Sequence, residues 1–194
     1  MQIMFNADCV PVLYQIQGKA FNFPDLTSRL CPRCGADYLK KHGFYERYLI
    51  TVGFKGEIVI RRYCCHNCGR TVSLLPSFCH PLRAYGILAI FGILSEFYIK
   101  GHTACLAVKN FLAATGAECS RQLLLHYRQR VKKNFNNLVM AIIDIYTLRA
   151  PPVTEKVNTR EKVRQALSFI QSPADDSLKI FERTRTTYLT PQPI

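Results

Sequence analysis

The sequence predicts a small α+β fold, in which a β-hairpin between two cysteine pairs is followed by an all-α bundle. Three observations lead to this prediction. Cys-x-x-Cys-Gly motifs lie at 31–35 and 65–69, aromatic and β-branched residues fill the chain between them, and 82–149 turns to apolar residues at helical spacing. The chain then divides into an N-terminal extension (1–30), a cysteine-bearing segment (31–80), a helical segment (81–150) and a C-terminal helical tail, partly loose (151–194).

The two cysteine pairs have the spacing of zinc knuckles. In a knuckle two thiolates lie on a tight turn, and the following glycine allows a positive φ. Four thiolates complete a tetrahedral Zn²⁺ site with no position left for water, which is the arrangement of a structural site. With a β-hairpin between the pairs, the sequence predicts a zinc ribbon with one structural zinc ion, bound by Cys31, Cys34, Cys65 and Cys68.

Other interpretations of the nine cysteines stay open. Buried free thiols are one, because cysteine is among the most buried residue types. A disulfide framework fits less well, since the cysteine count is odd and no signal peptide is seen. Cys64 competes with Cys65 as a ligand, but only Cys65 completes the second Cys-x-x-Cys motif. His66, inside that motif, is interpreted as a solvent or phosphate contact.

The segment between the knuckles predicts a hairpin of strands at 44–51 and 57–63, with a glycine-containing turn at 52–56. A third short strand is expected at 71–76. Before the first knuckle, 10–16 is interpreted as an edge strand, because Pro11 is excluded from a sheet interior.

Helices are expected at 82–100, 104–113 and 120–148. Gly101 is the predicted C-cap of the first, while Thr103 and Ser120 are the predicted N-caps of the second and third. Pro151-Pro152 is expected to stop the third helix. Its core stripe is Leu124, Tyr127, Val131, Phe135, Leu138 and Ile142. Farther on, Thr159 is the expected cap of a helix at 160–171. Another helix is expected to begin at 173–176, with Asp175-Asp176 at its N-terminus. The chain is expected to be loose over 184–194.

The formal charge of +13 is concentrated in two segments. Residues 31–70 carry eight basic and three acidic side chains, and residues 81–149 carry nine and three. A local excess of this kind is typical of proteins that bind a polyanion. A basic surface that serves only solubility is the alternative.

The second and third expected helices, with the turn at 115–118, have the order of a helix-turn-helix, in which the start of the last helix enters the major groove of double-stranded DNA. Arg121 suits guanine and Gln122 suits adenine at base edges. A plain helical hairpin with a basic face is the alternative. The complete set of predicted DNA contacts is Arg47, Arg61, Arg62, Arg70, Ser120, Arg121, Gln122, His126, Arg128, Arg130 and Lys133. On the hairpin, aromatic side chains that simply cover the zinc site are an equal alternative to base stacking.

Several of these residues give a resemblance to a known family. Cys31-Pro-Arg-Cys-Gly, His42-Gly, Arg61-Arg62-Tyr63, Cys65-x-x-Cys-Gly-Arg-Thr and Leu74-Leu75-Pro resemble a zinc-ribbon family of bacterial mobile elements, similar to the N-terminal ribbon of insertion-sequence transposases. The run Ser120-Arg-Gln-Leu-Leu-Leu-His-Tyr-Arg is similar to the third helix that accompanies such ribbons. The resemblance covers about residues 31–135 and implies DNA binding, with Cys31, Cys34, Cys65 and Cys68 on zinc.

No catalytic function is expected. The carboxylates after the helical segment form no constellation for two metal ions, and about sixty residues are too few for a transposase catalytic domain. The expectation is a DNA-binding regulator or accessory factor of a mobile element, in the cytoplasm with the nucleoid and without a membrane span. A homodimer through 138–145 is an open possibility. A zinc-ribbon adaptor that binds another protein is the alternative function.

Overall fold

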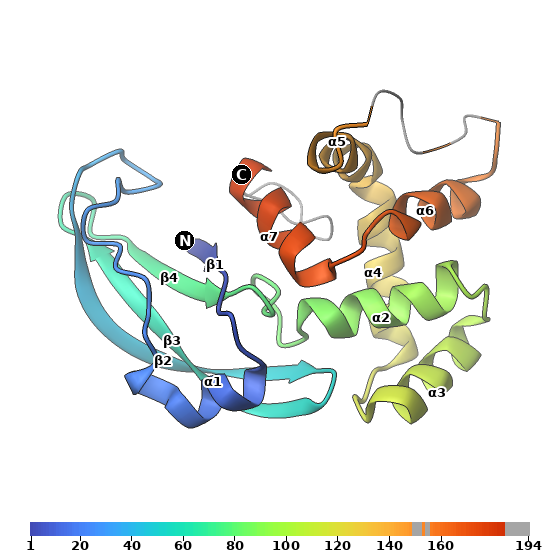
Figure 1. Ribbon diagram of the computed structural model, residues 1–194, viewed down its shortest axis with the longest axis horizontal. Helices are drawn as coiled ribbons and strands as arrows, with labels where there is room; N and C mark the ends of the chain where they lie inside the picture. Colours follow the sequence, from blue (N-terminus) through green and yellow to red (C-terminus); the bar gives the residue numbers. More distant parts are fainter. Residues whose placement is uncertain (149–152, 154–155, 185–194) are drawn as a thin grey trace.

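The strands gather at one end of the molecule and helices α2 to α7 at the other in the computed structural model, which describes residues 1–148, 153 and 156–184 (Figure 1). The protein is therefore α+β. The strands are β1 (Gln2–Phe5), β2 (Leu39–Thr51), β3 (Phe54–Cys65) and β4 (Thr71–Pro76). They form one sheet in the order β1-β4-β3-β2.

The predicted hairpin is confirmed, and it is longer than expected. Strands β2 and β3 pair antiparallel from Leu39 opposite Cys65 to Thr51 opposite Phe54. The turn between them is only Val52-Gly53, and Gly53 takes a positive φ of 71° that favours glycine. The third predicted strand is confirmed as β4, which pairs antiparallel with β3. The two cysteine pairs are thereby brought to the same end of the hairpin.

The first thirty residues take part in the sheet and its core. Strand β1 pairs parallel with β4, with Gln2 opposite Ser73. The edge strand expected at 10–16 is wrong, because this segment is helix α1 (Pro11–Gln17). Pro11 stands at the first helical position, where its missing N–H costs nothing, and Gly18 follows the last turn with a φ of 50°. Tyr14 is fully buried and donates from its hydroxyl to the Val59 carbonyl at 2.9 Å, so α1 is tied to β3.

A short 3₁₀ turn (Gly18–Ala20) follows α1. The remaining helices are α2 (Ile87–Tyr98), α3 (Ala104–Thr115), α4 (Arg121–Lys133), α5 (Phe135–Ile145), α6 (Thr159–Ser168) and α7 (Pro173–Thr184). The predicted N-caps of α3 and α4 are confirmed, since the hydroxyl oxygens of Thr103 and Ser120 accept from N–H groups three residues on. The predicted C-cap of the first helix is wrong, because α2 ends at Tyr98 with Ile99 as its C-cap; Gly101 follows two residues later, with a φ of 76°.

Three helix predictions need correction. The helix expected to start at 82 begins at Ile87, because residues 81–86 form an irregular linker in which Tyr85 bridges to Ile50. The helix expected over 120–148 is two helices, α4 and α5, which meet at Asn134. The cap of α6 is Asn158 and not Thr159, since the Asn158 side chain accepts from the Glu161 N–H at 3.0 Å. Asp175 and Asp176 lie in the first turn of α7, as expected. Residues 151–152 and 185–194 lie outside the described residues, so the expected stop and loose end stay predictions.

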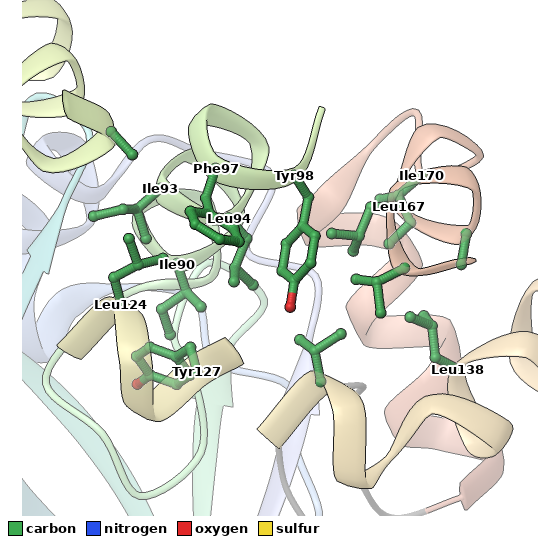
Figure 2. Close-up of a cluster of buried hydrophobic side chains, with 14 of the residues drawn as sticks. Ile90, Ile93, Leu94, Phe97, Tyr98, Leu124, Tyr127, Leu138, Leu167 and Ile170 are labelled. Carbon is green, nitrogen blue, oxygen red and sulfur yellow. The ribbon is translucent and has the colours of Figure 1, made fainter. Parts of the chain in front are cut away.

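Buried apolar side chains form two clusters, one on the sheet and one among the helices. Helix α2 is central to the second cluster, because it contacts α3, α4, α6 and α7 and also touches β2. Figure 2 shows residues of α2 facing residues of α4 and of the C-terminal helices across this cluster. The core stripe predicted for 120–148 is largely confirmed, since Leu124, Tyr127, Val131, Leu138 and Ile142 are buried there and Phe135 is partly buried against it. In the described part of the chain, no helix combines the length and the apolar character needed to cross a membrane.

Candidate metal centre and nucleic-acid surface

The two knuckles have the same backbone geometry. In the first, the Cys31 N–H donates to the Ala36 carbonyl at 2.8 Å and the Gly35 N–H donates to the Cys31 carbonyl at 2.9 Å. In the second, Cys65 and Gly69 repeat these bonds, with Arg70 in the place of Ala36, at 2.9 and 3.0 Å. Gly35 and Gly69 have φ values of 73° and 65°, a conformation that only glycine adopts at little cost. Each turn therefore presents its two sulfurs on one side.

The four predicted sulfurs are gathered in one place. The ligand atoms of Cys31, Cys34, Cys65 and Cys68 all lie within 4.8 Å of one another. Two cross-knuckle distances are 3.8 Å, between Sγ of Cys31 and Cys68, and 3.6 Å, between Sγ of Cys34 and Cys65. A tetrahedron with zinc–sulfur bonds of about 2.3 Å has edges of about 3.8 Å. The donor set and its spacing thus fit one four-coordinate ion such as Zn²⁺.

The pKa values of these thiols differ, and a cation would let all four lose their protons. The Ala36 N–H, which points at the Cys34 sulfur, lowers the pKa of Cys34 to about 6. The Arg70 N–H favours the Cys68 thiolate, but burial and the neighbouring cysteine sulfurs outweigh it and raise the pKa of Cys68 to about 11. Four thiolates at this separation repel one another, so a divalent ion is what allows all four to ionise together.

The neighbouring candidates lie outside the group of four. Cys64 turns its sulfur toward the carbonyl oxygens of Gly69 and Cys65, at 3.6 and 3.7 Å. It is Cys65, as preferred from the motif, that joins the cluster. His66 is exposed and makes an edge-on ring contact with Tyr38. Asn67 is the one neighbour in the second motif with a side-chain contact to a cluster sulfur, at 3.8 Å from Cys34.

The predicted DNA contacts on the sheet differ in how free their side chains are. Arg61 lies over the rings of Phe44 and Tyr63, and Arg62 lies over Tyr45. Arg70 is exposed at the second knuckle. The Arg47 guanidinium instead donates to the carbonyl oxygens of His80 and Arg83. Arg47 therefore ties β2 to the linker that precedes α2.

At the start of α4 the predicted contacts are exposed. Ser120 caps the helix, and Arg121 and Gln122 occupy its first turn with exposed side chains. Helix α3 packs against α4, and the segment between them, 116–120, turns the chain through Gly116, whose φ is 66°. The side chains at the N-terminal end of α4 thus lie open to a partner.

Farther along α4 the predicted DNA contacts differ in exposure, and one of them packs inside the protein. Lys133 is exposed, and Arg130 is half-buried. Arg128 lies with its guanidinium 4.1 Å above the centre of the Phe97 ring, and Arg160 from α6 lies 4.5 Å from the same centre. The Arg128 side chain is thus used inside the helical cluster. His126 is half-buried, and its Nε2 atom has no hydrogen-bond partner in the described part of the chain.

Part of the chain matches a family model. Residues 31–107 are similar to a Domain of unknown function (DUF6431). The DUF6431 match spans both knuckles, the hairpin, the linker and α2, and it stops in the first turn of α3. It covers less than half of the chain and does not reach α4. No curated protein and no solved structure matches the chain.

Proposed function

We propose that the protein binds double-stranded DNA, with a structural zinc ion that holds the ribbon and with α3 and α4 as a helix-turn-helix. The exposed first turn of α4 carries this proposal. Arg121 and Gln122 project from a capped helix that packs on α3, which is the arrangement that places side chains at base edges of the major groove. The charge of +13 supplies the attraction to phosphate.

The proposed phosphate contacts are the predicted basic residues whose side chains are exposed or half-buried. They include Arg130 and Lys133 on α4, and Arg61, Arg62 and Arg70 on the ribbon. The proposal leaves out Arg47 and Arg128, because their guanidinium groups contact carbonyl oxygens and the Phe97 ring. The ribbon then serves as a second, sequence-independent contact on the duplex backbone.

The cellular role that we propose follows from the resemblance of the motifs to transposase ribbons. The protein acts as a regulator or accessory factor of a mobile element, at the bacterial nucleoid, and it binds without cutting. The DUF6431 match is consistent with a recurrent ribbon module, and its description assigns no role.

An electrophoretic mobility shift across a salt series tests DNA binding. The proposal requires a retarded duplex whose affinity falls steeply with salt, because each phosphate contact releases condensed counterions. Arg121→Ala should lower affinity by about 1–3 kcal/mol and relax base preference at one position. Lys133→Ala should weaken all sequences alike. Specific binding that both variants leave unchanged would contradict the role of α4.

A protein-binding adaptor is the second candidate, and one observation favours it. Helix α1 and its cap expose four apolar side chains, namely Val10, Val12, Leu13 and Ile16. Exposed apolar groups in one place are typical of a protein-binding surface. If the wild-type chain fails to retard DNA at any salt concentration, DNA binding is wrong and this candidate replaces it.

A further inference from the structure

The linker between β4 and α2 carries a feature that its sequence does not indicate. Residues 81–86 form no helix, and Leu82 has a φ of 62° with 78% of its surface exposed. A left-handed backbone at leucine is strained, so the surrounding structure must hold it. Arg47 does so by donating to the carbonyl oxygens of His80 and Arg83, one on each side of the strained turn.

This turn fixes the position of Arg83 beside α4. The side chain of Arg83 is exposed, and it forms no ion pair with any residue that the structure describes. The same holds for Arg130 on α4. Arg83 follows His80 by three positions, Arg130 follows Tyr127 by three, and the rings of His80 and Tyr127 contact each other. The two guanidinium groups therefore come from two different elements to one part of the surface.

The rings of His80, His126 and Tyr127 lie between the linker and α4. The ring centres of His80 and Tyr127 are 6.0 Å apart, and those of His126 and Tyr127 are 5.3 Å apart. The pKa of His126 is below its ordinary value because its ring is desolvated and because Arg83 and Arg130 place positive charge near it. The pKa of His80 is lowered to about 4, mainly by burial and also by the charges of Arg47, Arg83 and Arg130. Both arginines thus act on the same rings.

Polar atoms in this region lack partners as well. The His126 Nε2 atom and the Tyr127 hydroxyl are buried and form no hydrogen bond with the residues that the structure describes. Figure 2 shows Tyr127 at the edge of the helical cluster, with its hydroxyl oxygen pointing away from the apolar side chains drawn above it. A concentration of positive charge, backed by buried rings and free of carboxylate partners, is a site that an anion stabilises.

We infer that Arg83 and Arg130 together clamp one backbone phosphate of duplex DNA, at the junction between the linker and α4. This inference rests on the proposed function and adds a residue to it, because Arg83 lies outside the predicted DNA contacts. A phosphate there lies beside the helix that enters the major groove, so the clamp fixes how deep α4 is placed. Arg47 is a positioning residue, since its two hydrogen bonds hold the turn that presents Arg83.

The test uses the full zinc-loaded chain and the duplex of the salt series. Arg83→Ala is expected to weaken binding roughly tenfold on every sequence and to reduce the slope of log affinity against log salt by about one. Phosphate ethylation interference should then lose a contact in the Arg83→Ala variant that the wild-type chain shows. Arg29→Ala is the matched control, because Arg29 is an exposed arginine that belongs neither to the linker nor to α4, and it should keep both affinity and interference pattern.

The outcomes separate the two proposals. If the wild-type chain retards no DNA, the proposed function and the clamp both fail. If it does bind, and Arg83→Ala keeps full affinity and the complete interference pattern, only the clamp fails. Thermal unfolding of Arg83→Ala should match the wild type, since the exposed side chain forms no ion pair with any described residue and the carbonyl that Arg47 uses is retained.

Arg47→Lys provides a second measurement. Lysine keeps the charge that a direct phosphate contact needs but cannot bridge two carbonyl oxygens with a planar fork. We expect it to weaken binding severalfold in the wild-type background and to have no further effect in Arg83→Ala. An equal loss in both backgrounds would show that Arg47 acts independently of Arg83, which contradicts its positioning role.

Discussion

Among the four clustered sulfurs, the exposure of the ligands differs sharply. Cys31 and Cys65 are buried, Cys68 is half-buried and Cys34 is exposed. The two first cysteines of the motifs thus belong to the core of the sheet, whereas Cys34 is the ligand most open to solvent. At the scale of single residues, Cys34 is therefore the position where ligand chemistry can be changed with the least damage to packing.

Cys34→Ser is expected to remove tightly held metal without changing the sheet core. A serine hydroxyl is a far weaker zinc ligand than a thiolate, and three thiolates leave the ion open to water and to competitors. We expect about one zinc ion per chain in the wild type and a strong loss in Cys34→Ser after exposure to a competing chelator, measured by elemental analysis. Cys64→Ser is the control, because Cys64 is adjacent to a ligand and outside the cluster. Metal loss from Cys64→Ser, or retention in Cys34→Ser, would contradict the assigned set.

At the scale of elements, the close approach of α2 and α3 depends on one residue without a side chain. A Cβ atom added at Gly92 would lie 2.7 Å from Cε2 of Phe111, which is buried in the helical cluster. Helix α3 would have to move away from α2 to make room. Since α3 packs on α4, such a movement would also shift the helix pair proposed to bind DNA.

Gly92→Ala is expected to destabilise the protein by about 1–3 kcal/mol through overpacking, although alanine has the better helix propensity by about 1 kcal/mol. Denaturant unfolding measures the net effect. Leu88→Ala, on the exposed side of the same helix, should change the free energy of unfolding by about 0.5 kcal/mol or less. A Gly92→Ala variant more stable than the wild type would show that α2 and α3 are not packed as closely as described.

At the scale of the whole molecule, the four cysteines lie at only one of the two buried clusters, so a bound metal ion would affect the two clusters differently. Cys31 and Cys65 belong to the sheet cluster, and Cys68 packs against it. The helical cluster is built from α2 to α6 and contains no ligand. A metal ion held by the four cysteines would stabilise the sheet directly. It would act on the helices through the contacts between the two parts, such as those of α2 with β2 and of α7 with β1.

Chelation is expected to unfold the sheet part first. Without an ion the four sulfurs are no longer held together, so the sheet should lose its fixed packing. The far-UV circular dichroism signal of the helices should largely persist. Near-UV circular dichroism, to which the buried aromatic side chains of both clusters contribute, should fall in part in the same sample. Zinc added back should restore the near-UV signal. Loss of both signals in one step would show that the two clusters form a single cooperative unit.

Features that depend on residues close together in the sequence were predicted correctly, whereas features that depend on distant residues were not. The cysteine cluster was predictable from the spacing of its two motifs, and the hairpin from its glycine-containing turn, because both are local signals. Strand β1 was not, since its partner in β4 lies about seventy residues away and no local pattern reveals the pairing. The helix at Pro11–Gln17 was mistaken for a strand because a short apolar run is ambiguous between the two.

The predicted ends of the helices were wrong for similar reasons. The apolar composition of 82–86 continues into α2, so the linker could not be distinguished from the helix, and Arg83 was not considered. The core stripe runs without interruption through Asn134, and so it hides the break between α4 and α5. Arg128 has the spacing of a surface residue, yet its guanidinium lies on Phe97. Side-chain partners of this kind depend on tertiary packing, which periodicity does not encode.

The parallel pairing of β1 with β4 has a consequence for synthesis on the ribosome. The first strand leaves the exit tunnel long before its partner has been translated, and Ile3, Met4 and Phe5, which are buried in the finished sheet, have no cover in the meantime. The hairpin and its knuckles are completed just before β4 emerges. Zinc supply during translation would therefore set how long this apolar segment waits exposed to chaperones and to other nascent chains.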